Sequence, residues 1–256
     1  MAYWEAMSDA KPLTRLYFPG ELAPGRSCAL PPPQAHHALH VLRLKRGDPV
    51  KLFNGDGAEY AAEIVEAGRD GLALRVTGRE AVDREAPIAV TLAQAVSSGE
   101  RMDYTLQKAV ELGVAAVQPL ETRRSVVRLT GDRAQKRLAH WQAVAIAACE
   151  QSGRNRVPRV LPLLRLDAFL KDRGPRRDAE QRLLLSPRSR RRFRDLEQPA
   201  GTVVILAGPE GGFSPGEEQA AETSGFLPVR LGPRVLRTET AAMAALAALQ
   251  ALWGDF

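Results

Sequence analysis

From residue 88 onward the chain alternates short apolar runs with segments of helical spacing, and this alternation constrains the fold more than any other feature of the sequence. Each apolar run is short and bounded by Gly, Pro or polar residues, as expected of buried strands. The expected strands are residues 88–95, 114–119, 183–185, 203–206 and 228–231, and the expected helices are 97–113, 133–151 and 239–253. Strands that alternate with helices usually pair in parallel. The sequence therefore predicts an α/β fold, a parallel sheet covered by helices.

The region before it, residues 14–79, has a different pattern, in which short strands are separated by turns. Asn54-Gly55-Asp56-Gly57 is a hairpin turn signal, because Gly and Asn accept the positive φ that such turns need. The one helical candidate is residues 33–42. Short strands at close spacing predict a small β-barrel. We therefore expect an N-terminal extension at residues 1–13, a barrel at 14–82 and an α/β domain at 83–256.

The composition is that of a globular protein, with 45% apolar and 26% charged residues among 256. No stretch approaches the roughly 20 uncharged apolar residues of a membrane span, and the first eleven residues lack the apolar core of a secretory signal. Cys28 and Cys149 form neither a disulfide framework nor a metal set, so we expect a cytoplasmic protein. His36, His37 and His40 lack further ligands at suitable spacing, and we expect no metal.

Charge is distributed unevenly along the chain. Residues 1–194 contain 33 basic and 22 acidic side chains, a net charge of +11, whereas residues 195–256 contain 3 and 8, a net charge of −5. A long basic region favours contact with a polyanion such as nucleic acid. A solvated basic surface is the alternative, since 30 of the 36 basic residues are Arg, a bias that genomic base composition can produce.

Three expected helix starts carry a capping signal. Ser97 with Glu100, and Ser214 with Glu217, each match a capping box, in which a hydroxyl and a carboxylate three residues apart bind each other's backbone N–H groups. Thr238 has the residue type of an N-cap ahead of the last expected helix. We therefore expect all three hydroxyl side chains to cap helices.

The most specific local feature is the segment from Leu206 to Glu217, where a buried strand runs into a Gly-rich turn and a helix starts at once. It lacks the Lys-Ser/Thr pair of a phosphate-binding P-loop and the G-x-G-x-x-G spacing of a dinucleotide fingerprint. Glycines at such a turn let a ligand approach bare backbone N–H groups. A tight turn with no ligand is the alternative.

A second loop, from Leu231 to Thr240, again joins a short strand to a helix. That helix is rich in alanine, which permits close packing against a sheet or against a second copy of the helix. Two such loops at the carboxyl ends of adjacent strands form the crevice in which open α/β sheets bind ligands. An adenosine-type cofactor is the ligand that we expect there.

These segments resemble a known family. GPEGGFSPGE at 208–217, followed by LGPRVLRTETAAMAAL at 231–246, resembles the SPOUT-class methyltransferases, specifically the 16S ribosomal RNA uridine-N3 methyltransferases of the RsmE type. Further segments resemble the same family in the same order, at residues 15–18, 37–48, 108–114, 124–127 and 150–158. The resemblance covers residues 14–254, nearly the whole chain.

The resemblance implies an N-terminal PUA-like β-barrel that contacts RNA, followed by a SPOUT-type α/β domain with a C-terminal trefoil knot. It implies S-adenosylmethionine as methyl donor and a homodimer whose active site is completed across the subunit interface. The implied activity is methylation of N3 of a uridine in 16S ribosomal RNA, within the small ribosomal subunit. The alternatives are an RNA-binding accessory protein with a non-catalytic knot and a methyltransferase for another rRNA or tRNA nucleoside.

Carried over by position, the cofactor site of that family would lie among three loops whose backbone groups hold the adenine and ribose. The residues implied are Leu185, Ser186, Pro187, Gly208, Pro209, Gly211, Gly212, Leu231, Gly232, Val235, Leu236 and Thr238. RNA contact is expected from basic residues of both domains, namely Arg15, Arg43, Lys45, Arg46, Arg123, Arg124 and Arg128. The five arginines within residues 188–194 have no assigned role.

Methylation at N3 requires an unpaired uridine, removal of the N3 proton, and N3 held in line with the methyl group. Arg154 and Arg237 are candidates to stabilise the developing uracil oxyanion, and Asn155 is a candidate to orient the base. Glu210 is a candidate base, on the condition that burial raises its pKa. A carboxylate that only holds the loop in place is the alternative for Glu210.

Overall fold

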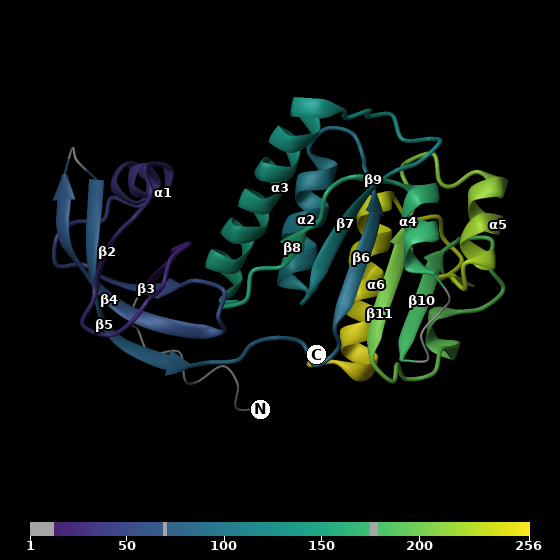
Figure 1. Cartoon of the computed structure of the whole chain (residues 1–256). Coiled ribbons are helices and arrows are strands. Elements are labelled where there is room, and N and C mark those ends of the chain that lie inside the picture. Colours follow the sequence, from purple (N-terminus) through teal and green to yellow (C-terminus); the bar gives the residue numbers. More distant parts are fainter. Residues whose placement is uncertain (1–12, 69–70, 175–178) are drawn as a thin grey trace. The chain divides into compact units, whose positions relative to one another are not determined.

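Two units, each with its own sheet, make up the computed structural model, which describes residues 13–68, 71–174 and 179–256 (Figure 1). The first unit comprises the described residues up to Arg84 together with Gly153–Arg156, and the second comprises Glu85–Ser152 and Val157–Phe256. The short segment 153–156 therefore belongs to the first unit, although it is far from it in the sequence. The expected extension at residues 1–13 lies outside the described residues except for Leu13.

The first unit is built on a five-stranded sheet with the strand order β1-β3-β4-β5-β2. Its elements are β1 (Thr14–Tyr17), β2 (Ser27–Ala29), α1 (Pro32–His36), a π-helical turn (His37–Val41), β3 (Pro49–Phe53), β4 (Ala58–Gly68) and β5 (Gly71–Ala81). Strands β3 and β4 form the expected hairpin around Asn54-Gly55-Asp56-Gly57. Alternate residues of the strands, such as Leu52, Ile64 and Leu74, fill the core.

The second unit contains a seven-stranded sheet in which every recorded strand pairing is parallel, as the sequence pattern predicts. The strand order is β12-β10-β11-β6-β7-β8, and β9 also pairs with β7. The strands are β6 (Val90–Ala95), β7 (Ala116–Glu121), β8 (Arg159–Val160), β9 (Leu164–Arg165), β10 (Glu180–Leu185), β11 (Thr202–Ala207) and β12 (Leu227–Val229).

Helices cover both faces of this sheet (Figure 1). They are α2 (Arg101–Glu111), α3 (Gly131–Ser152), α4 (Leu166–Arg173), α5 (Pro215–Thr223) and α6 (Thr238–Trp253), and a 3-10 turn spans Phe193–Asp195. Helix α6 packs on β6, β11 and α2, whereas α4 and α5 pack on β7, β9 and β10. Val204 and Leu206 of β11 lie in one core cluster with Phe169 of α4 and with Phe226.

Helix α2 begins later than the sequence predicts. The expected capping box of Ser97 and Glu100 does not form: α2 begins at Arg101, and its N-cap residue Glu100 makes no side-chain cap hydrogen bond. The neighbouring Ser98 instead donates its backbone N–H and its hydroxyl to the carboxylate of Glu210, each at 2.9 Å. The turn before α2 is therefore held by Glu210, which lies 112 residues further along the chain. Past the other end of α2, Gly113 has a φ of +80°, which suits the expected helix stop.

No helix of the described residues is long and apolar enough to cross a membrane. The part of the chain that the structure describes also holds no group of three or more His, Cys, Asp or Glu side chains arranged for a metal ion.

Candidate functional site

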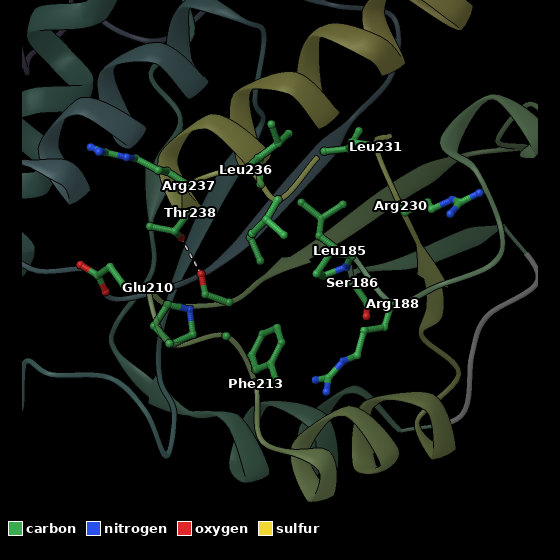
Figure 2. Close-up of a pocket in the computed structure, with 18 of the residues that line it drawn as sticks. Leu185, Ser186, Arg188, Glu210, Phe213, Arg230, Leu231, Leu236, Arg237 and Thr238 are labelled. Carbon is green, nitrogen blue, oxygen red and sulfur yellow. Dashed lines mark hydrogen bonds between the residues drawn. The ribbon is translucent and has the colours of Figure 1, made fainter. Parts of the chain in front are cut away.

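A cavity of about 580 Å³ lies in the second unit beyond the carboxyl ends of β10, β11 and β12 (Figure 2). The loops after these three strands and the first turn of α6 line it. All twelve residues for which the resemblance implies cofactor contact are among the lining residues: Leu185, Ser186, Pro187, Gly208, Pro209, Gly211, Gly212, Leu231, Gly232, Val235, Leu236 and Thr238. Three loops that are far apart in the sequence thus share one cavity.

The glycine loop after β11 is folded tightly against Phe213, which is buried. A Cβ atom on Gly208 would lie 3.2 Å from the Phe213 ring, closer than nine in ten such contacts, so a larger residue there would require the ring to shift by a few tenths of an ångström. Gly212 has a φ of +65°, a conformation that L side chains rarely adopt. The loop then enters α5 through the expected capping box, in which Ser214 and Glu217 bind each other's backbone N–H.

Arg124 fastens the same loop. Its guanidinium donates to the backbone carbonyls of Gly211 at 2.9 Å and Phe213 at 3.3 Å. Arg124 was expected to contact phosphate, because no core element follows it in the sequence. The structure gives its guanidinium contacts with this loop beside the cavity, while the side chain is exposed, so phosphate contact stays a prediction.

Thr238 joins α6 to the glycine loop. Its hydroxyl donates to the carbonyl of Gly208 at 2.5 Å (Figure 2). It also accepts from Nε2 of the buried Gln94 at 3.0 Å. The prediction that Thr238 is the N-cap is wrong, because Arg237 occupies the N-cap position and Thr238 is the first residue of α6. The Thr238 hydroxyl bonds to the carbonyl of Gly208 and to Gln94 instead of capping its own helix. The sequence analysis did not identify Gln94, which carries no motif.

Glu210 accepts hydrogen bonds from the N–H and the hydroxyl of Ser98 and from Arg101 Nη1, all at 2.9 Å. Burial alone would raise the pKa of Glu210, but these hydrogen bonds, together with one to its own backbone, outweigh burial and lower the pKa to about 2. Glu210 was a candidate base only if burial raised its pKa. That prediction is wrong, because the pKa is lowered. A carboxylate held so firmly in its ionised form is a weak proton acceptor.

Several cations surround the cavity. Arg237, the sequence candidate for charge stabilisation, lines it and is exposed. The sequence analysis gave no such role to the other arginines that line it, Arg101, Arg188, Arg230 and Arg234. Arg188 belongs to the arginine-rich segment that had no assigned role, and it pairs with Glu218 at 3.1 Å.

Arg154 and Asn155 do not line this cavity; they belong to the first unit and are buried there. The amide of Asn155 accepts from Arg15 Nη2 at 2.7 Å and donates to the carbonyl of Val82 at 2.9 Å. The carbonyl of Arg154 accepts from the same Arg15 Nη2 at 3.1 Å. Both polar ends of the Asn155 side chain are thus engaged within this unit, so its contacts are structural.

The partner that organises these contacts is Glu59, a buried carboxylate that the sequence analysis did not identify. It pairs with Arg15, with Lys51 Nζ at 2.6 Å and with Arg84 Nη1 at 2.6 Å. Burial alone would raise the pKa of Glu59, but its bonds to these cations lower the pKa to about 2. Arg15 was expected to contact RNA; its side chain is almost fully enclosed by this cluster.

The other basic residues expected to contact RNA differ in exposure. Arg43, Lys45 and Arg46, close together in the sequence of the first unit, are all exposed, and Arg43 has a φ of +57°. In the second unit Arg128 pairs with Glu121. Arg123 is exposed and donates its backbone N–H to Glu217 at 2.7 Å.

A second hollow, of about 760 Å³, lies along the outer face of α6. Small and apolar side chains of α6 line it on one side, and the turn around Phe193 lines it on the other. The lining residues of α6 are Thr240, Ala244, Ala248, Ala251 and Leu252.

Comparison with known proteins identifies the same division of the chain. A family model described as an RNA methyltransferase domain matches residues 84–250, and one described as an RNA methyltransferase PUA domain matches residues 30–77. The ribosomal RNA small subunit methyltransferase E of Mycobacterium bovis is 35% identical over 221 residues, 86% of this chain and 84% of that protein. The protein of the same name from Buchnera aphidicola is 29% identical and covers 96% of each chain.

Two solved structures are similar over nearly the whole chain. The crystal structure of a ribosomal RNA small subunit methyltransferase E from Neisseria gonorrhoeae, bound to S-adenosyl methionine, has a TM-score of 0.88 and 42% identity over 96% of this chain and 100% of that one. A Legionella pneumophila structure that also contains bound S-adenosylmethionine has a TM-score of 0.91 and 40% identity over the same shares. The chain thus belongs to the RNA methyltransferase family, with a PUA domain followed by a methyltransferase domain.

Proposed function

We propose that this protein transfers the methyl group of S-adenosylmethionine to N3 of a uridine in 16S ribosomal RNA of the small ribosomal subunit. The observation that carries the proposal is the cavity beyond β10, β11 and β12, whose lining includes all twelve residues implied by the family resemblance. The similar Neisseria gonorrhoeae protein, which carries S-adenosyl methionine in its structure, supports the same assignment. Since ribosomal RNA is the substrate, we place the protein in the cytoplasm.

The residues of the cavity fit an adenosine-containing cofactor. A volume of about 580 Å³ lies within the usual range for small-molecule sites. Leu185, Leu231 and Leu236 offer apolar contact to a flat base, and the glycine loop leaves backbone groups accessible to polar atoms. Several arginines at the rim suit the carboxylate of an amino acid moiety or a nucleic acid phosphate.

When bound, the cofactor supplies an electrophilic methyl group on a sulfonium centre. The chain's own residues hold the reacting groups in place: Thr238 and Arg124 fix the glycine loop from two sides. Arg237, at the start of α6, is the cation that we assign to the negative charge that develops on the uracil oxygens. Arg154 and Asn155, first considered for catalysis, are assigned to the internal structure of the first unit.

RNA contact is proposed for the PUA domain, through the exposed Arg43, Lys45 and Arg46. Three neighbouring cations provide phosphate contacts that position the RNA without reading its sequence. Arg123 is the corresponding candidate in the methyltransferase domain, because its side chain is exposed.

We further propose that the protein is a homodimer and that residues 231–238 belong to a trefoil knot, as the family resemblance implies. The hollow along α6 supports the dimer: its alanine-rich wall leaves room for a second helix to pack closely. A second copy of α6 is the occupant that such a self-complementary face would accept.

Two experiments test the function. Calorimetric titration of the purified protein with S-adenosylmethionine should give saturable binding, and absence of binding would favour the accessory-protein alternative. Mass spectrometry of 16S rRNA from cells that lack this protein should show loss of one N3-methyluridine, restored by the wild-type gene. Retention of that nucleoside, together with loss of a different methylated nucleoside, would instead assign another RNA target.

A further inference from the structure

Three carboxylates line the cofactor cavity, and their surroundings differ. Glu210 accepts from Ser98 and Arg101, and Glu218 pairs with Arg188. Glu239 is the exception. Its Oε2 atom is buried, yet it has no hydrogen-bond partner among the residues that the structure describes.

A buried carboxylate oxygen without a partner is unfavourable, because it has lost its bonds to water and gained none from the protein. Such atoms in folded proteins call for an explanation, of which a functional role is one. Glu239 lies in the first turn of α6, where the positive end of the helix dipole favours acidic side chains. Glu239 thus lines the cavity with a carboxylate oxygen that lacks a donor, and such an oxygen can accept a hydrogen bond or a proton from a ligand.

The proposed reaction requires such an acceptor. Uracil N3 carries a proton that must leave before N3 can bond to carbon, and a positioned side chain can take it. Glu210 and Glu218 already have cationic partners, and Arg237, which also lines the cavity, immediately precedes α6. The acceptor and the cation for the oxyanion would thus come from neighbouring positions of one helix start.

We propose that Glu239 is the catalytic base, which removes the N3 proton of the target uridine; this rests on the proposed methyl transfer to N3. In the step, the N3–H bond breaks and its proton passes to Glu239 Oε2. The electron pair left on N3 forms the new bond to the methyl carbon, while the carbon–sulfur bond breaks and its electrons remain on sulfur. The products are N3-methyluridine, the neutral thioether and a protonated Glu239.

The test compares Glu239→Gln, which keeps the size of the side chain and removes its basicity, with Glu239→Asp, which keeps the carboxylate. Glu222→Gln is the matched control, since Glu222 is an exposed carboxylate of α5 that does not line the cavity. Three quantities are measured for each variant: S-adenosylmethionine binding by calorimetry, 16S rRNA binding by filter retention, and the single-turnover methylation rate as a function of pH.

For Glu239→Gln we expect both affinities to stay within about twofold of wild type and the methylation rate at neutral pH to fall by a factor of about 10² to 10⁴, the usual contribution of a general base. The logarithm of its residual rate should then rise with slope one as pH increases, because only ionised uracil reacts. Glu239→Asp should retain more activity than Glu239→Gln, and Glu222→Gln should behave as wild type.

Two outcomes would overturn the assignment. A Glu239→Gln rate within about threefold of wild type would exclude a base role, and a loss of S-adenosylmethionine binding would assign Glu239 to the cofactor instead. Failure of the proposed function looks different, because the wild-type protein itself would then bind no cofactor or leave N3 unmethylated.

Discussion

The hydroxyl of Thr238 is a single group with two partners, the carbonyl of Gly208 and the amide of Gln94. It ties the first residue of α6 to the loop that follows β11, so it determines how closely two walls of the cavity approach. Thr238 and Gln94 are both buried, so the bond between them is shielded from water. The geometry of the cavity therefore depends on an oxygen atom that contributes little to its surface.

Replacing Thr238 by Val, which has the same shape but no hydroxyl, leaves the Gly208 carbonyl and the Gln94 amide without this partner. We expect the free energy of unfolding to fall by about 1–3 kcal/mol and S-adenosylmethionine to bind several-fold more weakly. Urea unfolding and calorimetric titration measure the two effects. Thr238→Ser should restore both quantities, and Thr202→Val, at an exposed position of β11, should change neither. Unchanged cofactor affinity in Thr238→Val would show that this hydroxyl does not shape the cavity.

Glu59 makes the stability of the first unit depend on pH. Its pKa is lowered to about 2 in the folded protein from an ordinary value of 4.5, so the folded state favours the ionised form. The stabilisation is present above pH 4.5 and is lost as pH falls from 4.5 through 2. It amounts to at most about 3 kcal/mol.

Urea unfolding followed by circular dichroism at pH 7, 4 and 3 checks this dependence. Glu59→Gln should lower the stability at pH 7, because Arg15 and Lys51 lose their shared counter-charge, and it should flatten the decline toward pH 3. An equally steep decline in wild type and variant would assign the pH dependence to other carboxylates.

Single residues were predicted from the sequence with uneven success, and the reason is the distance to their partners. The role of the glycines in the cavity loops can be predicted from the local sequence, because tight turns after strands favour glycine over other residues. Glu59 and Gln94 carry no motif. Gln94 bonds to Thr238, 144 residues away, and Glu59 pairs with Arg15, Lys51 and Arg84, which come from separate segments of the first unit. No local pattern could identify them.

At the level of elements, the start of α5 is a capping box that local sequence did predict. Ser214 and Glu217 bind each other's backbone N–H groups, and Glu217 also accepts the N–H of Arg123. This arrangement fixes where the glycine loop ends and the helix begins.

Ser214→Ala should lower the free energy of unfolding by about 0.5–2 kcal/mol, the usual cost of removing a hydroxyl N-cap. Ser214→Asp should retain most of the stability, because an Asp carboxylate caps nearly as well. Thermal unfolding of the three proteins measures the difference. If alanine and aspartate destabilised equally, the side chain would be needed for packing rather than for capping.

The same local signal failed at Ser97 and Glu100, and the comparison explains why. Both sites have a hydroxyl residue followed three residues later by a carboxylate. Before α2, however, Ser98 turns to Glu210, a stronger acceptor supplied by another strand–helix loop. A capping signal reflects only a local preference, and here a hydrogen bond to a residue far away in the sequence overrides it. The parallel pairing of the strands was predictable, because it follows from the alternation of apolar runs with helical segments rather than from single side chains, whereas the order of the strands in the sheet was not predicted.

At the level of the whole molecule, the proposed dimer makes a direct prediction about α6. Ala248 lines the hollow along this helix and is half-buried in a single chain. Replacing it by Glu would put a charge into the close helix contact that we propose, so the protein should become monomeric. Light scattering after size-exclusion chromatography measures the mass. Ala220→Glu, at an exposed position of α5, is the control and should leave the mass unchanged. A wild-type protein that is itself monomeric at micromolar concentration would contradict the dimer.

The bond between Gln94 and Thr238 also sets the order of events during synthesis. The cavity needs residues from β6, from the loop after β11 and from the start of α6, and these emerge from the ribosome in that order. Until α6 has been made and has docked, Gln94 and Gly208 lack their common partner and the last wall of the cavity is missing. A nascent chain therefore has no complete place for the cofactor, and cofactor binding can stabilise only molecules whose sheet is already finished.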